Sequence, residues 1–212
     1  MSRSFIIAGT DTNVGKTVLS SLLMAAHDDL FYWKPIQSGL EDETDSETVR
    51  KLSGCNAERI FPEAYKLHRP LSPHLSARLD GVSIDIEKLQ KPNAENLIIE
   101  TAGGVLTPIN ENTLQIELIK MWSIPVLIAA RSSLGTINHT LLTIEALRHR
   151  NIEIAGVIMI GESNLENEKA IRHYGKMEIV GRIPLLKDLN KESLRNTYKD
   201  HFSSLENILT YR

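Results

Sequence analysis

The stretch Gly9-Thr10-Asp11-Thr12-Asn13-Val14-Gly15-Lys16-Thr17 decides how this chain folds. It follows an apolar run at residues 5–9 and leads directly into the amphipathic stretch 15–26. A strand, a glycine-containing loop and a helix in this order are typical of a phosphate-binding loop, in which backbone N–H groups and the helix N-terminus form a cradle for anions. We expect Lys16 to reach the β- and γ-phosphates of a nucleotide and the hydroxyl of Thr17 to bind Mg²⁺.

Position 10 departs from the usual form of this loop. The usual form has glycine there, whereas this chain has Thr10 and places Gly9 one residue earlier. Without its context, the Gly15-Lys16-Thr17 triplet fits a tight turn with an incidental lysine as well as a nucleotide site. Its position between a predicted strand and a predicted amphipathic helix favours the nucleotide site.

Short apolar runs alternate with amphipathic stretches along most of the chain. The predicted strands are residues 5–9, 31–34, 97–100, 125–130, 154–160 and 179–183. The predicted helices are residues 15–26, 46–53, 112–122, 136–150 and 166–174. Several runs are apolar at every position, as expected for strands covered on both sides. The alternation predicts an α/β fold, a mostly parallel sheet with helices on both faces, in a single domain over residues 1–212.

Residues 59–96 interrupt this alternation. They contain Pro62, Pro70, Pro73 and Pro92, a short helix candidate near 84–90 and no strong strand signal. We expect an irregular insertion that serves the substrate or dimer side of the domain. Residues 191–212 are expected to form one or two surface helices.

Composition limits the class of protein. The 212 residues are 42% hydrophobic and 24% charged, which is ordinary for a globular domain. The net charge of −3 predicts no broad attraction to nucleic acid or to an anionic membrane. No apolar run approaches the ~20 residues of a membrane helix, and no signal peptide is evident, so we expect a cytoplasmic protein. A single cysteine, Cys55, excludes an intrachain disulfide.

Two further charged residues follow predicted strands. Glu100 ends the run 97–100 and Lys34 ends the run 31–34. Ligands bind at the carboxyl ends of strands in open α/β sheets, so Glu100 is a candidate Mg²⁺ ligand and Lys34 a candidate second cation for a phosphoryl group. A solvated carboxylate and a surface lysine remain open as alternatives. In the acidic cluster 41–45 no spacing rule selects one carboxylate.

Together these segments resemble the dethiobiotin synthetase family of the P-loop NTPase superfamily, which serves biotin biosynthesis. Besides the phosphate loop, which carries threonine at position 10 in that family, the resemblance rests on Lys34-Pro35-Ile36-Gln37-Ser38-Gly39, Thr44-Asp45-Ser46, Ser72-Pro73-His74, Glu100-Thr101-Ala102-Gly103-Gly104 and Leu134-Gly135-Thr136-Ile137-Asn138-His139. These segments occur in family order and span most of the chain.

The resemblance implies a ligase with ATP as co-substrate and Mg²⁺ as cofactor. Diaminononanoate would react with CO₂ to give a carbamate, whose oxygen attacks the γ-phosphate of ATP. The second amine then closes the ureido ring of the carbamic-phosphoric anhydride and releases phosphate. The family acts as a homodimer on small molecules, with no nucleic acid or membrane partner.

The resemblance also implies roles for individual residues. Lys16 and Lys34 are the implied catalytic residues. The implied Mg²⁺ ligands are Thr17, Asp45 and Glu100. Implied nucleotide contacts are Asn13, Val14, Gly15, Lys16, Thr17, Asp45, Glu100, Thr101, Ala102, Gly103 and Pro184. Implied substrate contacts are Thr12, Ser38, Leu134, Gly135, Thr136 and Asn138, of which the last four contact the substrate carboxylate across the homodimer interface.

The chain departs from the family at two places. Many members have an adenine-reading asparagine at the end of the fifth strand, where this chain has Met159-Ile160-Gly161-Glu162. We therefore expect relaxed base selection or contacts to the backbone alone. Thr101 replaces the more usual glycine, and its side chain is expected to crowd or contact phosphate.

Three other functions remain as alternatives. A partitioning or septum-site regulatory ATPase carries a signature lysine at the position of Asp11, and the aspartate argues against that class. Another carboxylate- or amide-activating ligase is disfavoured by the segment from Lys34 to Ser38. A nucleotide-binding module without turnover is the third alternative.

Overall fold

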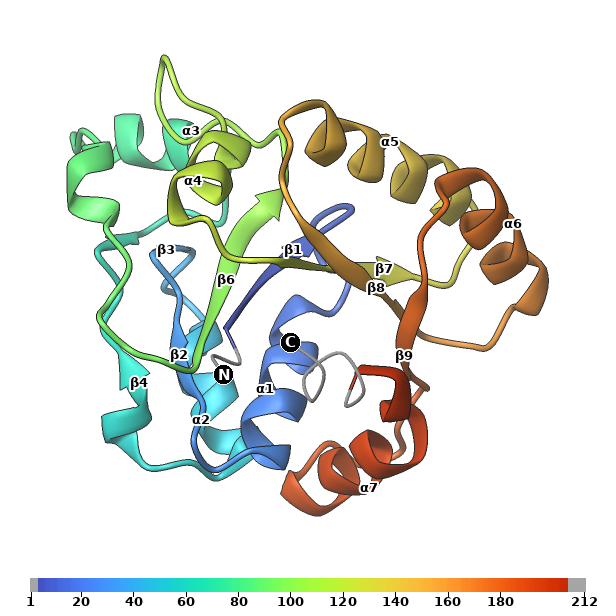
Figure 1. Ribbon diagram of the computed structural model, residues 1–212. Helices are drawn as coiled ribbons and strands as arrows, with labels where there is room; N and C mark the ends of the chain where they lie inside the picture. The colour runs from blue at the N-terminus through green and yellow to red at the C-terminus, as the bar shows by residue number, and fades with distance from the viewer. Residues whose placement is uncertain (1–3, 206–212) are drawn as a thin grey trace.

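A parallel sheet forms the centre of the molecule (Figure 1). The computed structural model describes residues 4–205, and within them seven strands lie in the order β4-β2-β6-β1-β7-β8-β9, with every neighbouring pair parallel. The strands are β1 Phe5–Gly9, β2 Phe31–Trp33, β4 Ile60–Phe61, β6 Leu97–Gly104, β7 Val126–Arg131, β8 Ile154–Ile160 and β9 Ile179–Ile183. The prediction of an α/β fold built on a mostly parallel sheet is confirmed.

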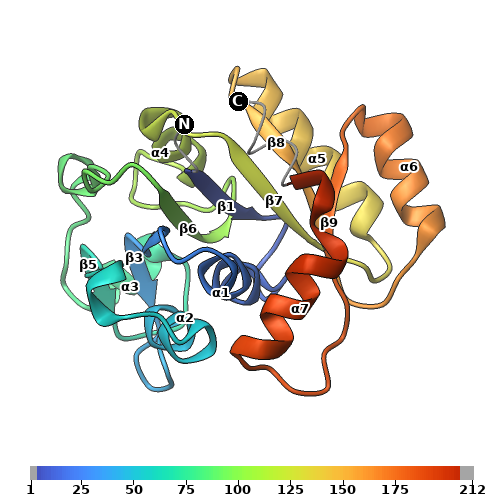
Figure 2. The same ribbon diagram turned by 60° about the horizontal axis from the view of Figure 1, so that its bottom comes forward.

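Helices cover both faces of the sheet, as predicted. On one face α1 lies between α2 and α7 (Figure 2). The helices of this face are α1 Lys16–Ala26, α2 Asp45–Ser53 and α7 Lys191–His201. The opposite face carries α4 Gln115–Trp122, α5 Thr136–His149 and α6 Leu165–Gly175. The helix interiors predicted from sequence therefore all occur, with ends that move by at most three residues.

Alternation along the strands sends side chains into two separate cores. Ile6 and Ala8 of β1 pack under α4, α5 and α6. Phe5 and Ile7 of the same strand pack under α1, α2 and α7. Burial on both faces explains why β1 is apolar at every position rather than at alternate ones.

Residues 59–96, which show no strong strand signal in the sequence, contain two short strands. That segment contains β4 and also β5 Tyr65–Leu67, which pairs in parallel with β3 Ile36–Ser38 as a second, two-stranded sheet. It continues with α3 Pro73–Leu79 and with the 3-10 helix η2 Ile86–Leu89, which lies within the predicted short helix near 84–90. Another 3-10 helix, η1 Ala57–Arg59, precedes β4. Strands of two or three residues are too short to show a period in the sequence, and only their pairing stabilises them.

The remaining expectations concern the chain as a whole. Cys55 is buried and free. None of the helices within residues 4–205 has both the length and the apolar character required to cross a membrane. The predicted C-terminal helical region begins with α7, and its last residues, 206–212, lie outside the described part of the chain.

Because the strands are parallel, their carboxyl ends meet at one edge of the sheet. β1 lies between β6 and β7, with Ile7 opposite Glu100 in the register of the first pair. β2 pairs with the other side of β6. The phosphate loop after β1, Lys34 after β2 and Glu100 of β6 are therefore neighbours in space.

Candidate nucleotide and metal site

The loop after β1 follows a tight path into α1. A Cβ atom at position 9 would lie 2.6 Å from the backbone oxygen of Asp11, so glycine is required there. Gly15, which precedes α1, has a φ of +96°, in the left-handed region that favours glycine. The amino group of Lys16 donates a hydrogen bond to the carbonyl oxygen of Asp11 at 3.1 Å. Thr10 is compatible with this path because the close approach occurs at Gly9.

A cavity of about 820 Å³ opens beside this loop. Eleven of the residues predicted for the site line it: Thr12, Asn13, Gly15, Lys16, Thr17, Lys34, Ser38, Asp45, Glu100, Ala102 and Gly103. The remaining wall residues are Val18, Ile36, Gln37, Pro70, Leu71, Ser72, Pro73 and Thr107. The segment around α3, which belongs to the insertion 59–96, therefore forms one wall of this cavity. The sequence predicts that this insertion serves the substrate or dimer side.

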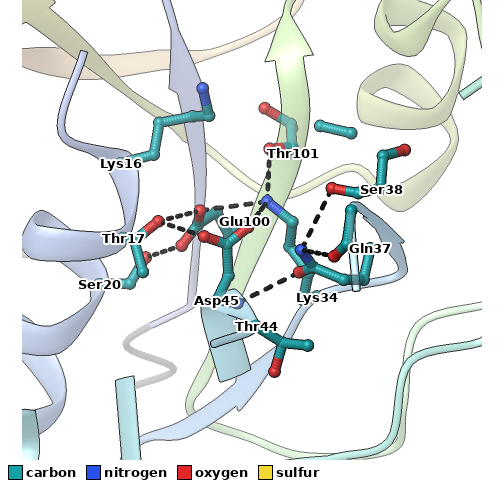
Figure 3. Close-up of polar contacts among 12 residues, drawn as sticks. Lys16, Thr17, Ser20, Lys34, Gln37, Ser38, Thr44, Asp45, Glu100 and Thr101 are labelled. Carbon is teal, nitrogen blue, oxygen red and sulfur yellow. Dashed lines mark hydrogen bonds and ion pairs between the residues drawn. The ribbon is translucent and has the colours of Figure 1, made fainter. Parts of the chain in front are cut away.

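Four polar side chains meet at one point of this cavity (Figure 3). The hydroxyl oxygen of Thr17 lies 2.8 Å from Asp45 Oδ1 and 3.0 Å from Glu100 Oε1. The ammonium of Lys34 lies 2.7 Å from Asp45 Oδ2 and 3.2 Å from Glu100 Oε1. Glu100 is fully buried and Lys34 nearly so. The alternatives of a solvated strand-end carboxylate and a surface lysine are therefore wrong.

The oxygen atoms of this cluster suit Mg²⁺. Among residues 4–205 no group of three or more His, Cys, Asp and Glu side chains is arranged to hold a metal. A divalent ion at this point would therefore need the Thr17 hydroxyl and ligand phosphates besides the carboxylates of Asp45 and Glu100. Mg²⁺ is commonly bound in this way, through one or two carboxylates and substrate phosphates.

Burial and neighbouring charges shift the pKa values of the charged groups. Burial, aided by the nearby Lys34 ammonium, lowers the pKa of Lys16 to about 8. Burial acts in the same direction on Lys34, but Glu100 and Asp45 outweigh it and raise the pKa of this lysine. Burial would raise the pKa of Asp45, yet the Lys34 ion pair and the Thr17 hydroxyl lower it. Lys34 is thus held as a cation and Asp45 as an anion.

The start of α2 places Asp45. The Thr44 hydroxyl accepts a hydrogen bond from the backbone N–H of Glu47, and the Glu47 carboxylate accepts one from the backbone N–H of Thr44. This capping box fixes the first turn of the helix. The backbone N–H of Asp45 also donates to the side-chain oxygen of Gln37 at 3.2 Å. Asp45 is therefore held by contacts that the acidic composition of residues 41–45 does not reveal.

Some predicted residues do not line this cavity. Val14 belongs to the phosphate loop, but its side chain is buried in the core beneath α1. The Thr101 side chain donates to the carbonyl oxygen of Ile7, so it points into the sheet and neither crowds nor contacts the phosphate site. Pro184 lines a separate cavity of about 280 Å³ beside the ends of β8 and β9. The segment predicted for the substrate carboxylate, Leu134, Gly135, Thr136 and Asn138, begins α5 and does not line the 820 Å³ cavity of its own chain.

Two further residues, which the sequence alone did not indicate, belong to this cluster. Ser20 Oγ donates to Glu100 Oε2 at 2.7 Å, and Tyr32 Oη donates to the same oxygen at 3.0 Å. Ser20 lies three residues after Thr17, on the same side of α1, and this spacing could have revealed it. Tyr32 occupies an apolar run as an ordinary core residue would, so no sequence signal distinguishes it.

The fold and the phosphate loop define the class of this protein as a P-loop NTPase. A family model described as "AAA domain" matches residues 3–193. The MinD cell division protein of Aquifex aeolicus superposes with a TM-score of 0.59 at 16% identity over 100% of this chain and 98% of that one. A ParA family ATPase from Chlorobium tepidum gives a TM-score of 0.54 at 11% identity over 100% and 95%. At such identities the likeness concerns the fold alone.

Within that class, this chain belongs to the ATP-dependent dethiobiotin synthetase family. It is 50% identical over 204 residues to a relative of that name from Agrobacterium fabrum, covering 96% of each chain. The corresponding protein of Nitrobacter hamburgensis is 48% identical over 204 residues, again covering 96% of each. The relative from Brucella melitensis biotype 2 is 50% identical over 203 residues, covering 95% of each.

Proposed function

We propose that this protein catalyses the ATP-dependent formation of dethiobiotin from 7,8-diaminononanoate and CO₂. The observation that carries the proposal is the meeting of Lys16, Thr17, Lys34, Asp45 and Glu100 around one cavity beside the phosphate loop. Two lysines and an oxygen cluster at one point suit the transfer of a phosphoryl group. Use of ATP also fits a cytoplasmic protein.

The reaction would proceed in three steps. One amine of diaminononanoate combines with CO₂ to form a carbamate, and a carbamate oxygen then attacks the γ-phosphorus of ATP, releasing ADP. The second amine attacks the carbonyl carbon of the resulting carbamic-phosphoric anhydride, and phosphate leaves as the ureido ring closes. Phosphate is a much better leaving group than oxide, so the mixed anhydride activates the carbonyl and no covalent enzyme nucleophile is required.

The chain's own residues would bind and stabilise charge. Lys16 and Lys34 place positive charge beside the transferring phosphoryl group. The backbone of the loop from Asn13 to Thr17 cradles the phosphates. Thr17, Asp45 and Glu100 would hold Mg²⁺, which neutralises charge on the phosphate oxygens when it is bound.

Ser38 is a candidate contact for the substrate. Its hydroxyl oxygen is buried without a hydrogen-bond partner in the described structure, although Ser38 lines the cavity. A buried hydroxyl without a partner costs free energy, which a bound polar ligand can recover. Pro70 and Leu71 form an apolar wall nearby. An amine or carbamate next to an aliphatic chain matches both features.

The active unit is proposed to be a homodimer. The residues predicted to bind the substrate carboxylate begin α5, where the helix N-terminus offers free N–H groups, but they do not line the cavity of their own chain. Leu134, Leu142 and Leu106 are exposed around this part of the molecule. A second copy packed against these side chains could direct its α5 N-terminus at the substrate of the first.

The test is product identification by mass spectrometry. The protein is incubated with diaminononanoate, bicarbonate, ATP and Mg²⁺, and each component is omitted in turn. We expect dethiobiotin, ADP and phosphate only in the complete mixture, and no turnover by Lys16→Ala. ATP hydrolysis that is independent of the substrate and yields no ring-closed product would sink the proposal and favour a regulatory ATPase.

A further inference from the structure

The two carboxylate oxygens of Glu100 have different surroundings. Oε1 lies near the Thr17 hydroxyl and the Lys34 ammonium, at the point where the metal would bind. Oε2 accepts hydrogen bonds from Ser20 Oγ at 2.7 Å and from Tyr32 Oη at 3.0 Å. Ser20, Tyr32 and Glu100 are all fully buried, so water does not compete for these bonds.

The fold brings these two hydroxyls to the same oxygen from different elements. In the register of β2 with β6, Tyr32 lies opposite Ile98, so Glu100 is two residues further along and on the same face of the sheet. Ser20 reaches Glu100 from α1, which packs on that face. Glu100 is thus held between a strand neighbour and a helix.

Two donors on one oxygen restrict what the carboxylate can do. An ionised carboxylate only accepts hydrogen bonds, with about two lone pairs on each oxygen. Ser20 and Tyr32 use those of Oε2 and so fix the plane of the carboxylate. Oε1 accepts hydrogen bonds from Thr17 and Lys34, which line the cavity and whose bonds a bound cation can replace.

We propose that Tyr32 and Ser20 are positioning residues that orient Glu100 so that Oε1 alone is presented to Mg²⁺. The inference rests on the proposed function, in which Glu100 is a metal ligand. Neither Tyr32 nor Ser20 lines the cavity. Groups that hydrogen-bond metal ligands in this way typically change metal affinity about 10- to 100-fold when they are removed.

A purely structural role makes a different prediction. If the two hydroxyls only satisfied a buried carboxylate, their loss would lower the melting temperature but leave the metal affinity of the folded protein unchanged. Tyr198→Phe is a matched control, because it also removes the hydroxyl of a buried tyrosine, which bonds His27 far from the site.

The experiment measures Mn²⁺ binding to the full chain with saturating ADP, by the loss of the free-ion electron paramagnetic resonance signal. Wild type, Tyr32→Phe, Ser20→Ala, the double variant, Glu100→Gln and Tyr198→Phe are compared, with circular dichroism to confirm folding. We expect each single variant to raise the Mn²⁺ dissociation constant severalfold and the double variant to raise it tenfold or more. The affinity of the Tyr32 and Ser20 variants for metal-free ADP should equal that of wild type. Tyr198→Phe should bind Mn²⁺ as tightly as wild type.

Activity as a function of Mg²⁺ provides a second readout. The positioning variants should need more Mg²⁺ for half-maximal rate but approach the wild-type kcat at saturating Mg²⁺. The proposal would be overturned if folded Tyr32→Phe and Ser20→Ala variants bound Mn²⁺ with wild-type affinity. If the double variant does not fold, the two single variants are sufficient for the test. If Glu100→Gln itself binds Mn²⁺ as wild type does, the metal role of Glu100 falls too. If the wild-type protein bound Mn²⁺, and the variants bound it more weakly, but wild type formed no dethiobiotin, only the proposed reaction would be contradicted.

Discussion

The ammonium of Lys34 lies 2.7 Å from Asp45 Oδ2, inside the cluster where a divalent cation would bind. It also lies 3.2 Å from Glu100 Oε1, so one lysine forms ion pairs with both proposed carboxylate ligands. A bound Mg²⁺ would compete with Lys34 for these carboxylates. The ammonium displaced in this way could turn toward the phosphoryl group. Lys34 is therefore expected to have opposite effects on metal binding and on catalysis.

Replacement of this lysine, Lys34→Met, tests that expectation. Loss of its charge should lower kcat by about 100-fold or more, because charge stabilisation in the transition state is lost. The same variant should bind Mn²⁺ more tightly than wild type, since two carboxylates lose a competing cation. Lys51→Met, which removes an exposed lysine paired with Glu43, should change neither quantity. Weaker Mn²⁺ binding by Lys34→Met would contradict the prediction.

The lowered pKa of Lys16 predicts proton uptake on nucleotide binding. Without ligand, burial and Lys34 hold this pKa at about 8, below the ordinary value of a lysine. Phosphates favour the charged form, so binding raises the pKa again and takes up protons near and above pH 8. Nucleotide affinity should therefore be full below pH 8 and decline as the pH rises through it.

Isothermal titration calorimetry in two buffers of different ionisation enthalpy measures this uptake. Lys16→Arg is the control, because arginine stays charged throughout this range and should show neither the uptake nor the decline in affinity. Equal proton uptake by the two proteins at pH 8.5 would assign the effect to another group.

Removal of the α2 cap should affect both stability and the metal site. Thr44→Ala deletes the hydroxyl that accepts from Glu47 N, which we expect to cost about 1 kcal/mol in the free energy of unfolding. Because Asp45 follows directly, the variant should also need more Mg²⁺ for half-maximal activity. Asn164→Ala removes the corresponding cap of α6 and should cost similar stability without altering the Mg²⁺ requirement. Urea unfolding and Mg²⁺ titrations decide, and equal Mg²⁺ requirements in both variants would refute the link.

Base selection is expected to be weak. At the end of β8 this chain has Ile160, whose side chain packs close to Gly15 and has no group that can hydrogen-bond a base. In the described structure, no amide side chain lines the 280 Å³ cavity that contains Pro184. A site discriminates strongly against a wrong base only when binding of that base leaves buried polar groups of the site without hydrogen-bond partners. We expect kcat/KM for GTP and CTP within about tenfold of ATP, and a preference above a thousandfold would contradict this.

The proposed dimer depends on the exposed leucines near α5. Leu142→Glu places a charge on this surface and should shift the molar mass, measured by light scattering after gel filtration, from dimer toward monomer. Leu189→Glu changes an exposed leucine before α7 and should leave the mass unchanged. A wild-type protein that is monomeric at micromolar concentration would refute the dimer directly.

Much of the fold could be predicted because its signals are local. β1 and β8 are continuous runs without a polar side chain, and the phosphate loop is a contiguous motif. The short strands β4 and β5 could not be found, because their stability comes from pairing with β2 and β3 rather than from a pattern of their own. The direction of the Thr101 side chain could not be predicted for a similar reason, since it depends on the neighbouring β1.

The sequence was sufficient to establish the parallel α/β architecture, the position of the phosphate loop and the family. Each of these depends on patterns or motifs formed by residues that are contiguous in the chain. The tertiary structure alone decided which partners the charged groups have. Thr17 meets Asp45 and Glu100 across 28 and 83 positions of the chain, and Tyr32 reaches Glu100 across 68. Such contacts depend on strand register and helix packing, which place distant residues side by side, so no periodicity along the chain can reveal them.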